Sequence, residues 1–290
     1  MVRLLRPKQW TKNLLVFAAL LFSTQLTHLD SVTKAALAFV AMCLASSATY
    51  IFNDVADKDK DQLHPRKRLR PIAAGEVSVT LAIFLGAVLL VVSAALAIAV
   101  DAGVLAMIAF YLALQTVYNL WLKQMAIADV FVIATGFVLR AVLGAQAIQV
   151  PVSGWLLFCT GALSLMLGFA KRREELLSQG EDGSLTRSSL LAYNRPSLDV
   201  MVGMFGGVSI MSYWIYCLES PTGKIHPLLI TAPFVTYGVT RYLLMVFVQN
   251  VGGEPADILL KDAHIILSVL GFLVAAVIAL SIKVLPIIQN

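Results

Sequence analysis

Charged residues are scarce in this chain. Asp, Glu, Lys and Arg together make up 13% of its 290 residues, whereas 59% are hydrophobic. An ordinary soluble domain is excluded, because about a quarter of its residues would be charged. No hydrophilic stretch is long enough to fold separately, so we expect a single domain over residues 1–290.

Cysteine and histidine are also rare. The cysteines, Cys43, Cys159 and Cys217, are widely spaced in apolar segments, and the four histidines are equally scattered. This pattern supports neither a disulfide framework nor a zinc site. The net charge of +5 does not indicate nucleic-acid binding, because the basic runs lack nearby base-stacking aromatics and a soluble module. It suits anionic lipids and phosphorylated substrates.

Long apolar runs are abundant. A helix needs about 20 mostly apolar residues to cross about 30 Å of hydrocarbon. Nine segments approach that length: 12–29, 32–52, 79–100, 103–121, 127–149, 153–170, 197–218, 226–248 and 264–285. We therefore expect an all-α, polytopic membrane protein with about nine transmembrane helices.

Lys and Arg set the expected orientation. Most of the 22 lie at the N-terminus and in the loops after the second, fourth, sixth and eighth segments. Because such residues gather on the cytoplasmic side, we expect the N-terminus inside and the C-terminus outside. No convincing small-residue cleavage site follows the segment 12–29, so we interpret it as a retained helix and not as a signal peptide.

A polar stretch at residues 46–71 reads SSATYIFNDVADKDKDQLHPRKRLRP. A helix that continues through it at about 100° per residue presents oxygen-bearing side chains on one face. They are Asn53, Asp54, Asp57 and Asp61. Tyr50 projects into the same sector and Asp59 lies opposite. Such a face suits Mg²⁺ and a diphosphate, although a solvated helix cap is the simpler alternative.

Cations accompany these carboxylates. Lys67, Arg68 and Arg70 follow them, as counter-charges or merely as a topology signal. Lys12 and Asn13 belong to the opening RPKQWTKN, which also suits an interfacial anchor.

Two arginines lie within apolar segments. A charge at that depth is costly, so Arg140 should face the bundle interior and have an anionic partner. A purely structural ion pair is the alternative. Gly144, one turn later, permits close packing on the same side. Arg241 raises the same question.

Two further loops carry polar candidates. After the sixth segment come Lys171, Arg172, Glu175 and Tyr193, donors and acceptors suited to a phosphate or sugar, or else an ordinary helix-end salt pair between Lys171 and Glu175. The segment GGEPADILLKDAH contains Glu254 and Asp257, which suit a ligand site or helix capping.

NDVADKDKD matches the N-D-x-x-D-x-x-x-D motif of the UbiA-type intramembrane prenyltransferase superfamily. RPKQWTKN, HPRKRLRPIAAG, GFVLRAVLGA, AKRREEL and GGEPADILLKD resemble its decaprenyl-phosphate phosphoribosyltransferase branch. The resemblance spans nearly the whole chain. It implies a helical bundle around a central cavity, with a cytoplasmic polar cap, in the cell inner membrane.

The resemblance also implies an activity. It is the transfer of 5-phosphoribosyl from 5-phosphoribosyl 1-diphosphate (PRPP) to a polyprenyl phosphate, with Mg²⁺ held by Asn53, Asp54, Asp57 and Asp61, as a step of cell wall biosynthesis. Glu254 and Asp257 would bind metal, ribose or loop cations. Prenyl transferases of the superfamily carry a second D-x-x-x-D in the loop after the sixth helix, where this chain has AKRREELLSQGED. That difference favours a phosphate monoester at Lys171 and Arg172.

Two alternatives stay open. One is prenyl transfer from a prenyl diphosphate to an aromatic acceptor, which would use the same first motif. The other is a transporter of anionic lipids or solutes, since buried arginines also occur in transporters. The sequence leaves open whether the protein forms a homo-oligomer.

Overall fold

The computed structural model describes residues 2–23, 25–63, 67–182, 188–250, 258 and 261–283. Within these residues every regular element is a helix, which confirms the all-α prediction. Eight helices in this described part of the chain are long and apolar enough to cross a membrane. The chain is therefore a multi-span membrane protein.

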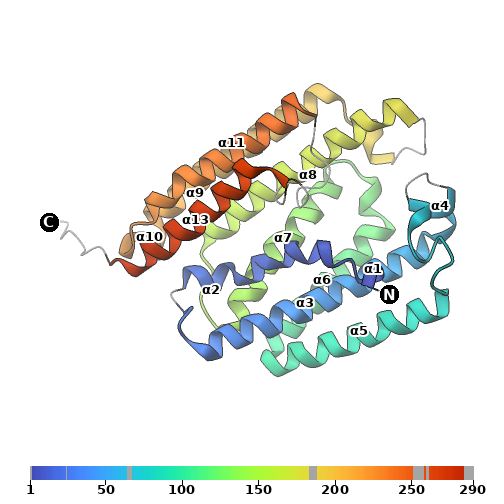
Figure 1. Cartoon of the computed structure of the whole chain (residues 1–290), viewed down its shortest axis with the longest axis horizontal. Coiled ribbons are helices and arrows are strands. Elements are labelled where there is room, and N and C mark those ends of the chain that lie inside the picture. Colours follow the sequence, from blue (N-terminus) through green and yellow to red (C-terminus); the bar gives the residue numbers. More distant parts are fainter. Residues whose placement is uncertain are drawn as a thin grey trace. The chain divides into compact units, whose positions relative to one another are not determined.

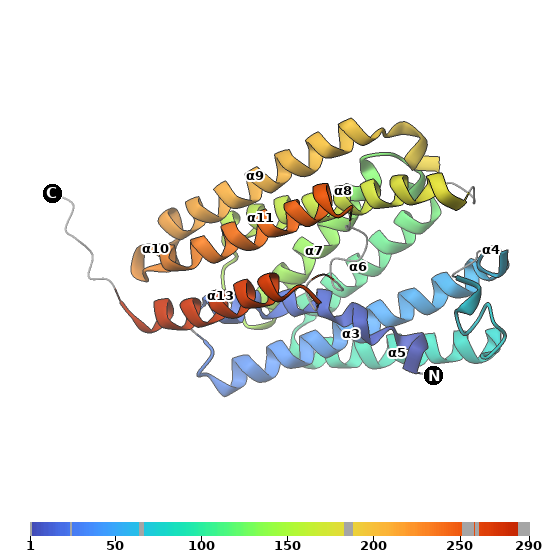
Figure 2. The ribbon, with the colours of Figure 1, turned by 45° about the horizontal axis from the view of Figure 1, so that its top comes forward.

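The long helices are shown in Figures 1 and 2. They are α3 (Leu29–Ala56), α5 (Val79–Val100), α6 (Ala102–Leu120), α7 (Ala128–Ala147), α8 (Gly154–Asp182), α9 (Arg195–Glu219), α11 (Ala232–Val248) and α13 (Ala263–Ser281). The short elements are α1 (Val2–Leu5), η1 (Pro7–Phe17), α2 (Ala18–Phe22), α4 (Lys58–Leu63), η2 (Lys67–Leu69), η3 (Leu122–Gln124), η4 (Ser188–Ala192), α10 (Pro221–Ile225) and η5 (Leu228–Thr231).

The chain forms two compact units, and each is described by itself. Unit 1 comprises Met1–Leu21, Gln25–Leu122 and Leu139–Pro151. Unit 2 comprises Phe22–Thr24, Lys123–Val138 and Val152–Asn290. The single-domain organisation stays a prediction.

Unit 1 is built on the pair α3 and α5, which lie side by side. Ala38, Ala41 and Ala45 of α3 are fully buried, because small side chains let neighbouring helices approach closely. Ser93 of α5 adds a hydrogen bond from its hydroxyl to the Ala41 carbonyl oxygen, at 2.8 Å. The pair gives the polar end of α3 a rigid base.

The first predicted segment differs from the expected continuous helix. It forms the 3₁₀-helix η1 followed by the five-residue α2. Because a 3₁₀-helix rises about 2.0 Å per residue, the two elements together still reach about 30 Å, the thickness of the hydrocarbon layer. Tertiary contacts accompany this geometry: the Trp10 indole donates to Ser47 at 3.1 Å, and the buried Asn13 amide donates to Ser46 at 3.2 Å.

Gly144 in α7 permits the close approach expected from the sequence. A Cβ atom at this position would lie 1.9 Å from the Val16 carbonyl oxygen, so only glycine lets the η1 backbone pass here. Both residues belong to unit 1.

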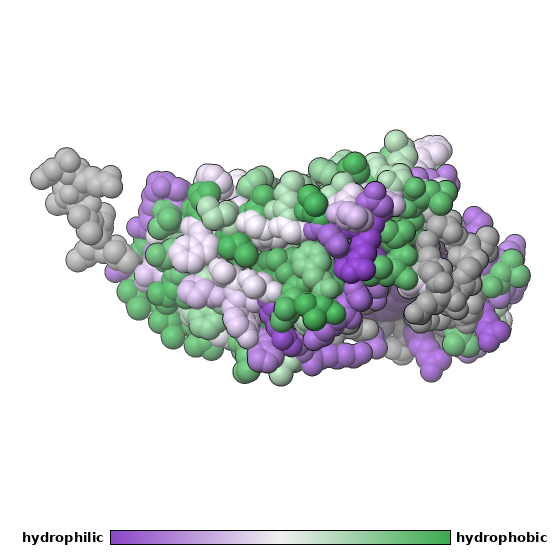
Figure 3. All heavy atoms as spheres, turned by 90° about the horizontal axis from the view of Figure 1, so that it is seen from above, coloured by the Kyte–Doolittle hydropathy of each residue, from purple (hydrophilic) through white to green (hydrophobic). Residues whose placement is uncertain are grey.

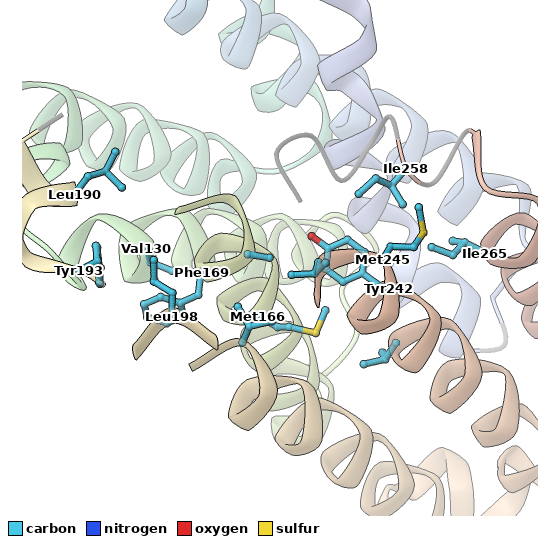
Figure 4. Close-up of a cluster of buried hydrophobic side chains, with 14 residues drawn as sticks. Val130, Met166, Phe169, Leu190, Tyr193, Leu198, Tyr242, Met245, Ile258 and Ile265 are labelled. Carbon is cyan, nitrogen blue, oxygen red and sulfur yellow. The ribbon is translucent and has the colours of Figure 1, made fainter. Parts of the chain in front are cut away.

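Unit 2 packs α8 against α9, with α11 and α13 alongside. Figure 4 shows its main apolar cluster, to which Met166 and Phe169 of α8, Leu198 of α9 and Tyr242 of α11 contribute. Val130, in the first half of α7, packs into the same cluster.

Two helices extend beyond the ends of the predicted apolar segments. α3 continues past residue 52 to Ala56, and α8 continues past residue 170 to Asp182. Lys, Arg and Glu in the α8 extension are good helix formers. Consequently both polar clusters described below are mounted on ends of long helices.

Apolar side chains cover much of the surface. Figure 3 shows one face on which hydrophobic residues predominate and hydrophilic residues form smaller groups. Phe84 and Val91 of α5 and Leu267 and Val274 of α13 are among the exposed large hydrophobic residues. Such a surface is suited to contact with lipid.

Candidate active site

The carboxylate face lies where α3 meets α4. Asp57 lies between the end of α3 and the start of α4. Its N–H bonds to the Asn53 carbonyl oxygen at 2.9 Å, and the Asp61 N–H bonds to the Asp57 carbonyl oxygen at 2.8 Å. The i to i−4 pattern therefore continues through the junction. Asp54 and Asp61 are buried, whereas Asp59 is exposed on the other side.

Two arginines neutralise the buried carboxylates of unit 1. The Arg6 Nη2 atom donates to both oxygens of Asp54, at 2.6 and 2.8 Å. The Arg70 Nη1 atom bridges the helix junction, because it lies 3.0 Å from Asp54 Oδ1 and 2.6 Å from Asp61 Oδ2. Arg70 was a sequence candidate, but Arg6 was not.

The turn before α5 places Arg70. The Arg70 N–H bonds to the Lys67 carbonyl oxygen at 2.9 Å, and the Ala74 N–H bonds to the Arg70 carbonyl oxygen at 2.8 Å. Gly75 closes this turn with a φ of 77°, a left-handed value that glycine adopts without a steric cost. The exposed Lys67 and Arg68 form the outer side of this segment.

The N-terminal segment places Arg6 by an unusual backbone. Arg6 has φ 49° and ψ 58°, in the left-handed region that costs a non-glycine residue energy, and it precedes a proline, which normally favours extended backbone. Leu4 is buried beside it, and the Ser47 hydroxyl donates to the Leu5 carbonyl oxygen at 2.8 Å. The Arg6 guanidinium also lies 5.0 Å from the centre of the Tyr50 ring.

The donor set fits a hard divalent cation. Asp54 and Asp61 already hold cationic groups, and Asn53 and Asp57 add half-buried oxygen donors at the same junction. Among the described residues no donor contacts the Asp57 carboxylate. In that part of the chain, no three acidic, His or Cys side chains converge as a metal group. Arg70 Nη1 occupies the point at which the Asp54 and Asp61 carboxylates meet, 3.0 Å from Asp54 Oδ1 and 2.6 Å from Asp61 Oδ2.

Arg140 lies in a second buried network of unit 1. Its Nε atom donates to Asn13 Oδ1 at 2.7 Å, and its Nη2 atom donates to the Tyr111 hydroxyl at 3.3 Å. Asn13 in turn donates to Ser46 and Cys43, each at 3.2 Å. The predicted interior position of Arg140 is correct, and these described partners are neutral groups. Lys12, the residue before Asn13, is half-buried.

Unit 2 contains a buried acidic residue that the sequence reasoning did not single out. The Arg172 Nε atom lies 3.0 Å from Asp129 Oδ2, and both side chains are at most 2% exposed. Tyr193 and Ser189 donate to Asp129, each at 3.4 Å. In the sequence, Asp129 is an acidic residue in the first turn of an apolar helix. Such a residue resembles one that merely interacts favourably with the helix macrodipole, so it was not identified as a site residue.

The predicted loop candidates Arg172, Glu175 and Tyr193 lie around this pair. Glu175 accepts a hydrogen bond from Arg172, and Lys171, its predicted partner, is half-buried nearby. Burial raises the pKa of the Tyr193 hydroxyl above its ordinary value, which keeps it protonated as a donor to Asp129.

Arg241 forms a bidentate contact with the residue that caps α13. Its Nη2 atom lies 2.7 Å from Asp262 Oδ2 and its Nε atom 3.3 Å from Asp262 Oδ1. The hydrogen bonds from Arg241 hold the pKa of Asp262 below its ordinary value. Glu254 and Asp257 lie outside the described residues.

An apolar pocket of about 250 Å³ opens between α8, α11 and α13 of unit 2. Its lining includes Met166, Val239, Tyr242 and Phe272. The Tyr242 hydroxyl, labelled in Figure 4, is buried and has no hydrogen-bond partner within the described ranges. The lining suits a hydrocarbon chain.

Comparison with known proteins gives consistent results. The model of the UbiA prenyltransferase family matches residues 14–180. The decaprenyl-phosphate phosphoribosyltransferase of Corynebacterium glutamicum is 34% identical over 99% of this chain and 87% of its own length. The protein of that name from Mycolicibacterium smegmatis is 31% identical over 90% of this chain and 86% of its own.

Solved structures resemble the fold. A UbiA homologue from Archaeoglobus fulgidus bound to GPP and Mg²⁺ has a TM-score of 0.73 at 20% identity, over 97% of this chain and 99% of that one. A UbiA homologue from Aeropyrum pernix has a TM-score of 0.65 at 15% identity, over 95% and 96% of the two chains.

Proposed function

The chain belongs to the UbiA prenyltransferase family, and from that membership we propose that it transfers 5-phosphoribosyl from PRPP to a polyprenyl phosphate and releases pyrophosphate. The observation that carries this proposal is the similarity, along nearly the full length, to relatives named for decaprenyl-phosphate phosphoribosyl transfer. The enzyme is a transferase of the membrane.

The carboxylate face of unit 1 is the proposed binding site for the Mg²⁺ complex of the diphosphate. Asp54, Asp57 and Asp61, with Asn53, supply the oxygen donors that Mg²⁺ prefers. The cation, when bound, neutralises charge on the departing pyrophosphate. The solved structure of the UbiA homologue from Archaeoglobus fulgidus, which is bound to GPP and Mg²⁺, supports this assignment.

The surrounding cations of unit 1 orient the phosphates. Lys67, Arg68 and Arg70 follow the carboxylates directly and donate to anionic oxygens. Lys12 and Tyr50 belong to the same unit as donors for the substrate, and Asn13 fixes the guanidinium of Arg140. The acceptor needs no dedicated base, because the second pKa of a phosphate monoester is about 6. A single displacement then inverts the configuration at C1 of the ribose.

In unit 2 the proposed role is binding of the 5-phosphate. Arg172 is held by Asp129 and Glu175, and the preceding residue, Lys171, is half-buried. Glu175 and Tyr193 complete this cluster. Arg241 is assigned to substrate binding, with Asp262 as its anchor. Glu254 and Asp257 are assigned to binding of the ribose or the metal ion.

Lys171→Ala should weaken PRPP binding by at least about tenfold and change binding of inorganic pyrophosphate by less than twofold. The reason is that a lost charge-assisted hydrogen bond costs about 1.5–3 kcal/mol, and pyrophosphate has no 5-phosphate to lose it. Isothermal titration of the purified protein measures both constants. Lys224→Ala is the control, because Lys224 is exposed and paired with Glu219. Equal losses for both ligands would place Lys171 at the diphosphate.

The cell inner membrane, with a cytoplasmic N-terminus and active site, is the proposed location. It rests on the distribution of Lys and Arg. The apolar pocket of unit 2 is the proposed place for part of the acceptor chain.

Substrate choice tests the proposed function. The purified chain should release pyrophosphate from PRPP only when Mg²⁺ and a polyprenyl monophosphate are both present, because the lipid phosphate is the nucleophile. A coupled assay of pyrophosphate measures this. Consumption of a prenyl diphosphate with an aromatic acid, and indifference to PRPP, would instead establish prenyl transfer. Counterflow uptake into liposomes without pyrophosphate release would indicate a transporter.

A further inference from the structure

Arg6 occupies the position of a cation at Asp54. Its Nη2 atom contacts both carboxylate oxygens, at 2.6 and 2.8 Å, and Asp54 itself is 4% exposed. The second cation, Arg70, donates a hydrogen bond to Oδ1 of the same carboxylate at 3.0 Å. A divalent ion bound to Asp54 would therefore lie within a few ångströms of the Arg6 guanidinium, and the two like charges would repel strongly.

The charges of the cluster show what a metal ion requires. Asp54, Asp57 and Asp61 contribute three negative charges, and Arg6 and Arg70 contribute two positive ones, which leaves one net negative charge among these groups. A divalent ion alone would make the cluster net positive and deprive a guanidinium of its counter-charge. A divalent ion that arrives with a diphosphate brings that counter-charge with it.

The two arginines differ in the backbone that carries them. Arg70 bridges Asp54 and Asp61 and is fixed by the turn from Lys67 to Ala74. Arg6 contacts Asp54 and the Tyr50 ring, and its side chain is about as exposed as that of Arg70, 26% against 29%. Its left-handed backbone is sustained by the anchored Leu4 and Leu5 on one side, so its guanidinium is delivered to Asp54 at a conformational cost.

From these observations we infer that Arg6 controls metal binding. Its guanidinium neutralises Asp54 in the ligand-free protein and moves to the diphosphate when the metal complex binds. The metal ion and the diphosphate then bind together. Asp54 has a positive partner in both states, which is Arg6 in the ligand-free protein and the metal ion in the complex. Arg6 becomes a ligand-binding residue for the phosphate oxygens. This inference rests on the proposed binding of a metal-diphosphate at the carboxylate face, and it holds for either diphosphate donor.

Metal binding without turnover tests the inference. The full chain in nanodiscs of neutral lipid is titrated with Mn²⁺ in equilibrium dialysis, with and without inorganic pyrophosphate, and protein-bound Mn²⁺ is the excess of total manganese on the nanodisc side over the protein-free side. The wild type should bind Mn²⁺ weakly alone and at least tenfold more tightly with pyrophosphate. Arg6→Gln should bind Mn²⁺ alone at least tenfold more tightly than the wild type, and the gain from pyrophosphate should fall by a similar factor. Arg6→Lys should lie between the two.

The control is Arg3→Gln, which removes the same charge from an exposed residue of the same segment. It should match the wild type in both titrations. If Arg6→Gln equals the wild type with Mn²⁺ alone, or binds it more weakly, Arg6 is only a structural clamp and the inference fails. If the wild type binds no Mn²⁺ even with pyrophosphate, the proposed metal-diphosphate site itself fails. Retained helical circular dichroism in the variants separates both outcomes from unfolding.

Discussion

Asp57→Asn is expected to lower turnover by about 100-fold or more and to abolish Mg²⁺-dependent binding of PRPP. The Asp57 carboxylate is half-buried at the junction of α3 and α4, and no described residue donates to it. Its charge is therefore available to a cation, and an amide in its place loses the electrostatic stabilisation of the departing diphosphate. Steady-state release of pyrophosphate and equilibrium binding of PRPP measure the two effects.

Asp59→Asn is the matched control for this prediction. Asp59 lies two residues further on in α4 and is exposed on the opposite side. The same substitution there should leave turnover within about twofold, because the change lies away from the proposed ligand. Turnover of Asp57→Asn near that of the wild type would remove Asp57 from the metal-binding set.

Asp129→Ala should produce the largest loss of stability. Its partner Arg172 is 2% exposed. Without Asp129 this buried guanidinium keeps only Glu175, which is 31% exposed, as an acidic partner among the described residues, and loss of one member of a buried ion pair costs up to about 3–5 kcal/mol. For a chain of this size that corresponds to roughly 10 °C in the apparent midpoint of thermal unfolding. The midpoint is measured in detergent by the loss of helical circular dichroism.

The double variant Asp129→Leu with Arg172→Met identifies the cause. If the buried charge is responsible, the double variant should be more stable than Asp129→Ala, because apolar residues replace both partners and neither leaves a buried charge behind. Asp30→Ala is the control, since its pair with Lys34 is exposed, and such pairs contribute little. A double variant less stable than the single one would assign the effect to packing instead of charge.

Local periodicity predicted the carboxylate face because its determinants are local. The helical hydrogen bonds of α3 continue through Asp57 to Asp61, so a period of 3.6 residues places the carboxylates as expected. The same reasoning predicted about nine spans, of which eight are long apolar helices in the described part of the chain, and it predicted the close packing at Gly144. Hydrophobic length and helical spacing are properties of short windows of sequence.

The pairing of the charges could not be predicted in the same way. Arg6 reaches Asp54 through a left-handed backbone before a proline, a conformation that sequence rules disfavour. Asp129 meets Arg172 across two helices, and nothing in either local sequence specifies that distance. The 3₁₀ geometry of η1 likewise accompanies contacts with α3 that are remote in sequence.

The length of α3 sets the depth of the proposed active site in the bilayer. Lys34, paired with Asp30 in the first turns of α3, is about 30 Å along the helix from Asp54, which equals the thickness of the hydrocarbon. In the proposed orientation, with Lys34 at one edge of the hydrocarbon, the carboxylates would lie at the level of the lipid phosphates at the other edge, and an acceptor could react without lifting its tail out of the bilayer. At that depth phosphodiesters of ordinary lipids surround the site. The second negative charge of a phosphate monoester near neutral pH is the property by which the enzyme can select its acceptor from them.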